Sequence, residues 1–256
     1  MLLFRVGPEG FYAATDEDGE LRILHSDPFQ VDPAGWELGR IHQSGTTGLL
    51  APVLPGKILG VGRNYADHAR ELGNEVPDEP VLFLKSPSSI IGPTGTIVLP
   101  PESQQVEFEG EVALVLRRRL RRASESEARA AILGVTCACD VTARDLQRSD
   151  ATFARAKSFD TFCPMGPAIH VDADLSELEV VTRINGVERQ RGRSEEMLWN
   201  PLDLLVYASR MMTLESGDLV LMGTPAGVGR LADGDCLEVE VTGVGVLENQ
   251  VEGWRQ

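Results

Sequence analysis

Short apolar segments of strand length dominate this chain, and turn signals separate them more often than helices do. Clear examples lie at 57–62, 81–85, 132–139 and 219–222. The strand candidates outnumber the helix candidates and do not alternate with them, which argues against a doubly wound parallel sheet. The pattern predicts a β-rich α+β protein with few helices.

The helices and one hairpin have readable start and stop signals. A capping box opens the segment 124–131, and Asn-Pro at 200–201 opens a second helix. We expect a short third helix with Asn64 as its N-cap and Gly73 at its end. Asn-Gly at 185–186 predicts a tight hairpin between two strands.

The prolines at positions 52 and 55 mark a change in organisation. A chain of 256 residues has room for one large domain and one small one. We therefore predict a small N-terminal β domain at 1–55 and a larger domain at 56–256. Segments 26–47 and 86–101 lack strand patterns and are expected to be largely loop.

The charge balance limits the partners. With 24 basic and 39 acidic residues, the chain has a formal net charge of −15, so nucleic acid and anionic membranes would repel it. An acidic substrate is still compatible, because a metal ion and a few cations can reverse the field in one pocket. We see neither a signal peptide nor an apolar stretch of about 20 residues, and the four cysteines suggest buried free thiols, so we expect a cytoplasmic protein.

Three carboxylates are the strongest candidates for a metal site. Glu109 and Glu111 are two apart in a strand pattern and so point to one face, and Asp140 ends a second apolar run. Such hard oxygen ligands suit Mg²⁺, Mn²⁺ or Ca²⁺. The alternative is the solvated face of a half-buried sheet. Glu107 shares that face and is the first residue to check as a possible confounder.

Two other patterns have both a chemical and a plain interpretation. His68 and Glu71 lie three apart on the short helix, where they form either a general-base pair or an exposed polar face. Lys85 and Lys157 would offset a substrate carboxylate or an oxyanion, although most lysines do neither. The glycine-rich turn at 223–229 lacks the ending of a phosphate loop and is better interpreted as a turn near a ligand.

Taken together, the motifs resemble the fumarylacetoacetate hydrolase family over about residues 57–251. The matching segments, in chain order, are 61–71, 80–85, 108–115, 139–147, 156–160, 184–186 and 223–229. The resemblance implies a roll of mixed β-sheets with peripheral helices, usually a homodimer. It also implies Mg²⁺ or Mn²⁺ held by the three acids, a site that Ca²⁺ would also fill in a crystal.

The resemblance assigns further roles. His68 and Glu71 would form a catalytic dyad on a mobile lid, and Lys157 would support a charged intermediate. The expected contacts to a small-molecule substrate come from six side chains: Arg63, Tyr65, Lys85, Arg144, Gln147 and Thr224.

The function predicted from this site is hydrolysis of a C–C bond in a 1,3-diketo acid such as an acylpyruvate, through an enolate that the metal stabilises. Isomerisation or decarboxylation of an unsaturated 2-oxo diacid from aromatic-ring catabolism, or decarboxylation of oxaloacetate, passes through a similar enolate and is the alternative. A non-catalytic metal-binding protein on the same fold is a further alternative. The sequence leaves the exact substrate and the choice between Mg²⁺ and Mn²⁺ open.

Overall fold

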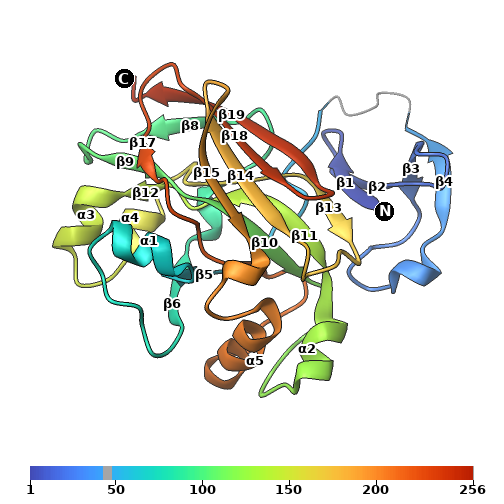
Figure 1. Cartoon of the computed structure of the whole chain (residues 1–256). Helices are drawn as coiled ribbons and strands as arrows, with labels where there is room; N and C mark the ends of the chain where they lie inside the picture. The colour runs from blue at the N-terminus through green and yellow to red at the C-terminus, as the bar shows by residue number, and fades with distance from the viewer. Residues whose placement is uncertain (43–47, 256) are drawn as a thin grey trace.

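The computed structural model describes residues 1–42 and 48–255 (Figure 1). Its largest sheet contains β1 (Leu2–Val6), β2 (Phe11–Thr15), β3 (Leu21–Leu24), β4 (Leu38–Ile41), β5 (Ile58–Gly62), β6 (Val81–Lys85), β7 (Ile90–Ile91), β10 (Gly110–Leu116), β11 (Ile132–Cys139), β13 (Cys163–Val171) and β16 (Leu219–Leu221). The strand order is β4-β3-β2-β1-β13-β11-β10-β16-β5-β6, and β7 pairs with β13. Most neighbours are antiparallel, but β16 pairs with β5 in parallel, so the sheet is mixed.

Two smaller sheets complete the β structure. One has the order β15-β14-β18-β19-β8, and the other has the order β12-β9-β17. Their strands are β8 (Thr96–Leu99), β9 (Val106–Phe108), β12 (Thr142–Ala143), β14 (Glu179–Ile184), β15 (Val187–Arg193), β17 (Gly229–Arg230), β18 (Cys236–Val241) and β19 (Gly245–Gly253).

The main core lies between the large sheet and the five-stranded sheet. On β10, Val112 and Leu114 face this core, whereas Ala113 and Val115 face a second apolar cluster on the other side of the strand. Successive side chains of a strand point to opposite faces, so β10 is buried on both of them. This strand is therefore a rigid support for the residues at its N-terminal end.

The helices are peripheral, as expected. They are α1 (Ala66–Glu71), α2 (Glu125–Ala131), α3 (Arg144–Ser149), α4 (Ala154–Lys157) and α5 (Pro201–Met211). In Figure 1, α1, α3 and α4 gather near the three-stranded sheet, whereas α2 and α5 lie together at another edge of the molecule. Within the described residues, none of these helices has the length and apolar character needed to cross a bilayer.

Several local predictions are confirmed. The Ser124 side chain and Glu127 form the capping box of α2, and the Asn200 side chain accepts two backbone N–H groups at the head of α5. Asn185 and Gly186 both have positive φ in the turn between β14 and β15. All four cysteines are free, and three of them are buried.

Other local predictions are met only in part. The segment 86–101 is largely outside strands but contains the short strands β7 and β8, and the described part of the segment 26–47, which ends at residue 42, contains β4. The helix α1 begins without a side-chain cap, because the Asn64 amide instead bonds the backbone of Trp199 and Met222. Gly73 does follow the end of this helix with a positive φ.

The N-terminal strands join the rest of the protein through β1, which pairs antiparallel with β13. The large sheet therefore runs without interruption from β4 to β6. The division of the chain near residue 55 stays a prediction.

Candidate active site

The three carboxylates meet where two neighbouring strands begin and end. The strand pattern is interrupted between β9 and β10, and Glu109 lies in this interruption, directly before Gly110. Asp140 directly follows β11, which pairs with β10 so that Gly110 lies opposite Cys139. The Asp140 amide donates to the Glu109 carbonyl at 2.8 Å, which holds these two residues side by side.

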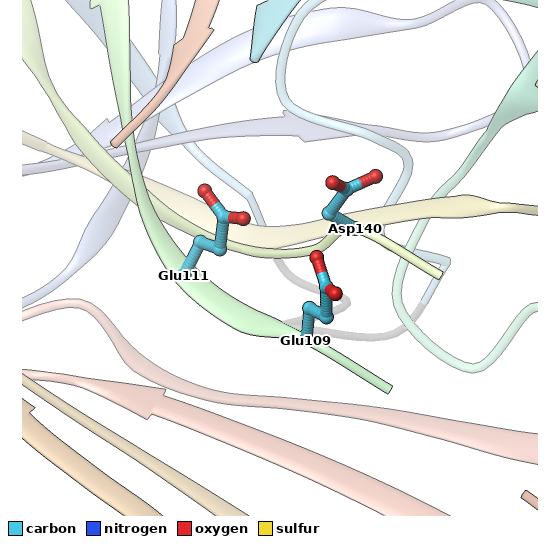
Figure 2. Close-up of side chains that lie close together, drawn as sticks. All are labelled: Glu109, Glu111 and Asp140. Carbon is cyan, nitrogen blue, oxygen red and sulfur yellow. The ribbon is translucent and has the colours of Figure 1, made fainter. Parts of the chain in front are cut away.

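Figure 2 shows the three side chains converging on one point. One carboxylate oxygen from each of Glu109, Glu111 and Asp140 lies within 4.8 Å of the others, and all three residues are buried. The alternative of a solvated sheet face is therefore wrong for these residues. Glu107 does not join the cluster, because its carboxylate accepts from Arg144 Nε at 2.7 Å and from Gln105.

Buried cations surround two of the three acids. Lys85 Nζ lies 2.7 Å from Asp140 Oδ1, and Lys157 Nζ lies 2.8 Å from Glu109 Oε2 and also bonds Asp140. Arg144 donates to both Glu107 and Glu109. Buried charges are tolerated when they are paired and hydrogen-bonded in this way.

The cations act unevenly on the trio. Burial alone would raise the pKa of Glu109, but Lys157 and Arg144 outweigh it and lower that pKa. Burial, and then the charges of Asp140 and Glu109, raise the pKa of Glu111 well above its ordinary value. Among the described residues, Glu111 is the member of the trio without an ion pair, and it accepts the Gly223 amide at 2.6 Å.

This donor set fits a hard divalent cation. Three carboxylate oxygens on a rigid support match the ligands that Mg²⁺ and Mn²⁺ prefer. Burial first, and then the charges of Asp140 and Glu109, raise the pKa of Glu111, so its negative charge is poorly stabilised without a further cation. A divalent cation would compensate that charge.

The cluster faces a cavity of about 250 Å³. The lining includes the trio and six other residues predicted from the sequence: Arg63, His68, Arg144, Gln147, Lys157 and Thr224. It also includes Phe83, Phe153, Asn74 and Arg148, which sequence reasoning missed. Arg63 has a φ of 57°, a strained backbone conformation of the kind found at functional sites.

His68 and Glu71 lie on α1 at the edge of the cavity. His68 is 4% exposed, and its Nδ1 lies 3.4 Å from Glu71 Oε2. The same Glu71 carboxylate accepts the Gly227 amide at 3.0 and 3.2 Å. The two side chains are therefore in contact, and the Glu71 carboxylate also ties α1 to the glycine-rich turn.

The geometry does not support substrate contacts by Lys85 and Tyr65. The Lys85 side chain is fully buried behind Asp140, where it also bonds the Lys157 and Val141 carbonyls. Tyr65 is buried and outside the cavity lining, and its hydroxyl has no hydrogen-bond partner among the residues that the structure describes. Lys85 supports Asp140 instead.

A family model confirms the resemblance. The model for the fumarylacetoacetate hydrolase C-terminal domain matches residues 57–252. The chain belongs to the fumarylacetoacetate hydrolase family. Solved structures of family relatives extend the match to the N-terminal strands, because they cover nearly the whole chain.

Two of the mycobacterial structures illustrate this similarity. The 5-carboxymethyl-2-hydroxymuconate delta-isomerase from Mycobacterium smegmatis is 39% identical, covers 99% of this chain and 100% of its own, and has a TM-score of 0.89. The 2-hydroxyhepta-2,4-diene-1,7-dioate isomerase from Mycobacterium marinum is 37% identical, covers 100% of both chains and has a TM-score of 0.88.

A sequence relative points in the same direction. The bovine mitochondrial oxaloacetate tautomerase FAHD2A is 41% identical over 215 residues, which are 79% of this chain and 68% of the relative. The predicted β-rich fold of this family is thus confirmed. The activities named for these three relatives are isomerisations and a tautomerisation, which favours the alternative function over C–C hydrolysis.

Proposed function

We propose that this member of the fumarylacetoacetate hydrolase family is a divalent-metal-dependent isomerase that moves a proton between the enol and keto forms of a 2-oxo acid. The observation that carries the proposal is a single cavity shared by the carboxylate trio, Lys157 and His68. A metal site and a proton carrier that face the same space are the parts that enolate chemistry requires. The activities named for the relatives favour isomerisation within that chemistry.

The protein's own groups have separate tasks in this scheme. A divalent cation held by Glu109, Glu111 and Asp140 would act as a Lewis acid toward the 2-oxo group and lower the free energy of the enolate. His68, oriented by Glu71, would take the proton from the carbon beside the carbonyl and return it to the enolate oxygen or to a conjugated carbon. The nearby ammonium of Lys157 would offset the negative charge while the proton is on His68.

The cavity also favours a substrate with two carboxylates. Arg144 and Lys157 are bound to protein carboxylates, but Arg63 and Arg148 form no ion pair with any residue that the structure describes. A second substrate carboxylate would pair with one of these two arginines. This supports a 2-oxo diacid over a neutral acyl compound.

Hydrolysis of an acylpyruvate remains the second candidate. The His68–Glu71 pair at the cavity is also the arrangement that activates water. Decarboxylation would use the same metal site. The homodimer, the cytoplasmic location and the choice between Mg²⁺ and Mn²⁺ stay predictions.

One comparison of substrates tests the proposal. Purified protein with Mn²⁺ would be mixed with the enol form of oxaloacetate, with a 2-hydroxydienedioate and with an acylpyruvate, and the products followed by proton NMR in D₂O. We expect accelerated ketonisation with deuterium incorporated beside the carbonyl. Release of pyruvate from the acylpyruvate with unaccelerated ketonisation would replace isomerisation by hydrolysis, and no turnover of any substrate would leave only a metal-binding protein.

A further inference from the structure

A buried glutamine outside the cavity holds the backbone between two of the candidate metal ligands. Gln190 lies on β15, is 1% exposed and does not line the cavity. Its side chain makes three hydrogen bonds, and all three lead to the segments that carry Glu109, Glu111 and Thr224.

Two of these bonds, together with one made by the Thr224 hydroxyl, form a closed ring at Gly110. Gln190 Oε1 accepts the Gly110 amide at 3.0 Å, and Gln190 Nε2 donates to Thr224 Oγ1 at 2.7 Å. The Thr224 hydroxyl in turn donates to the Gly110 carbonyl at 2.9 Å. Both polar backbone groups of the residue between Glu109 and Glu111 are therefore fixed by these two side chains.

The ring replaces a strand that is missing at this point. Farther along β10, Ala113 to Val115 pair with β16, but β16 ends at Leu221 and its chain turns away at Gly223. Gly110 therefore lies beyond the reach of that ladder. Buried backbone groups need partners, and here Gln190 and Thr224 supply them.

Glutamine suits this position because of its chemistry. The ring needs an acceptor for the Gly110 amide and donors for Thr224 Oγ1 and the Pro225 carbonyl, which lies 2.7 Å from Nε2. A neutral amide has both kinds of atom. A glutamate would lose both donor contacts and place a further carboxylate behind the trio.

The ring also limits what Thr224 can do. Its only proton is donated to Gly110, so its hydroxyl can accept from a ligand but cannot donate to one while the ring is intact. The substrate contact expected of Thr224 is thereby restricted to an acceptor role.

We infer that Gln190 is a positioning residue for the metal site, which acts through Gly110 and Thr224 to set the directions of Glu109 and Glu111. This inference rests on the metal site of the proposed function. It assigns the residue no contact with substrate. Partners of metal ligands commonly change metal affinity by about 10- to 100-fold when they are removed.

The test measures Mn²⁺ affinity by calorimetry and the melting temperature of the metal-free protein. Gln190→Met keeps the length of the side chain and removes its polar atoms, and we expect Mn²⁺ affinity to fall by about 10- to 100-fold. The matched control is Asn249→Leu, which removes another buried amide, one that donates to the carbonyls of Gly92 and Gly95. The control should lower the melting temperature and leave Mn²⁺ affinity unchanged.

A second pair of variants is informative if Gln190→Met does not fold. Thr224→Val breaks the ring and should weaken Mn²⁺ binding, whereas Thr224→Ser restores the hydroxyl and should bind as the wild type does. Both side chains act through Gly110, so their effects on Mn²⁺ affinity should not add. The double variant Gln190→Met/Thr224→Val should have about the same Mn²⁺ affinity as the single variant that binds Mn²⁺ less tightly.

Two results would overturn the inference. Wild-type Mn²⁺ affinity in Gln190→Met or in Thr224→Val, together with a lowered melting temperature, would make the ring merely structural and leave the proposed function intact. Failure of the wild-type protein itself to bind Mn²⁺ or Mg²⁺ would overturn both proposals.

Discussion

The Lys157 ammonium lies 2.8 Å from Glu109 Oε2 and bonds Asp140 on its other side. One buried cation thus serves two of the three candidate metal ligands. It also lies 4.9 Å from the centre of the Phe83 ring, which shields it on another side. In the metal-free protein, this ammonium takes over part of the neutralising task that a divalent cation would perform.

Lys157→Met should destabilise the metal-free protein by about 3–5 kcal/mol, because it leaves two buried carboxylates without their shared partner. Saturating Mn²⁺ should reduce this loss, since the metal supplies positive charge at the same place. Denaturant unfolding with and without Mn²⁺ measures both values. The control Lys57→Met breaks the Lys57–Asp218 pair elsewhere, and its loss should not depend on Mn²⁺. A loss in Lys157→Met that is the same with and without the metal would contradict this explanation.

Glu111→Gln should change how the stability of the metal-free protein depends on pH. Burial raises the pKa of Glu111 in the folded state, so between about pH 4.3 and that raised value the folded protein binds a proton that the unfolded chain releases. The free energy of unfolding therefore falls as pH rises through this window. Glu109 acts in the opposite sense below it, because Lys157 and Arg144 lower its pKa despite burial.

In Glu111→Gln, the fall in stability above pH 4.3 should be shallower than in the wild type. Near neutral pH without metal, the free energy of unfolding of the variant should equal or exceed that of the wild type. Mn²⁺ should no longer stabilise the variant. Unfolding curves over a pH series give the slopes. Identical slopes in the two proteins would mean that Glu111 is not the group responsible.

His68→Ala should slow the isomerisation by about 10²- to 10⁴-fold and leave Mn²⁺ affinity unchanged, because it removes a proton carrier and not a ligand. Glu71→Gln should have a smaller effect, since it keeps an acceptor for the Gly227 amide. The control is Asp67→Asn on the same helix, which alters an exposed pair with Arg70. Rates from the NMR assay should remain unchanged in this control, and a large drop there would point to helix stability instead of proton transfer.

Gly110→Ala should both destabilise the protein and weaken Mn²⁺ binding. A Cβ at this position would lie 1.9 Å from Thr182 Oγ1, so the strand would have to move. We expect a loss of about 1–3 kcal/mol. Adding Thr182→Ala removes the clashing atom and should recover part of the stability and of the affinity.

The control for this pair is Gly253→Ala, where an added Cβ would make only ordinary contacts of 3.8 Å or more with Asp233. That change should alter the melting temperature little. If Thr182→Ala gave no recovery in Gly110→Ala, the requirement for glycine would come from some cause other than the approach of β14.

The three carboxylates could be predicted to cluster from the sequence. The interruption of the strand that carries two of them could not. Strand alternation placed Glu109 and Glu111 on one face, but the structure interrupts the strand at Glu109 and restarts it at Gly110. At the restart, the Gly110 amide bonds the side chain of Gln190, which is 80 residues away in the chain. Local periodicity contains no information on such a partner.

Other expectations from the sequence differ from the structure for a related reason. The position of Lys85 at the end of an apolar strand predicts that its side chain is buried, but not which way the side chain points. Its ammonium bonds Asp140, and the residue does not line the cavity. Asn64 has the residue type of an N-cap, yet its amide bonds Trp199 and Met222, which lie far along the chain. The strand β8 has no strand signal in the sequence because its partner is β19, and parallel pairing over that separation leaves no local pattern.

The hydrogen bond from the Gly227 amide to Glu71 couples the position of α1 to the protection of one backbone proton. Gly227 has a φ of 102°, and a Cβ there would lie 2.0 Å from the Arg189 carbonyl, so the turn packs closely against β15 at a place where only glycine fits. Its amide proton is covered by a side chain that belongs to the helix carrying the candidate base. The hydrogen-exchange rate of the Gly227 amide would therefore report how often α1 moves away from the turn, with no substrate needed.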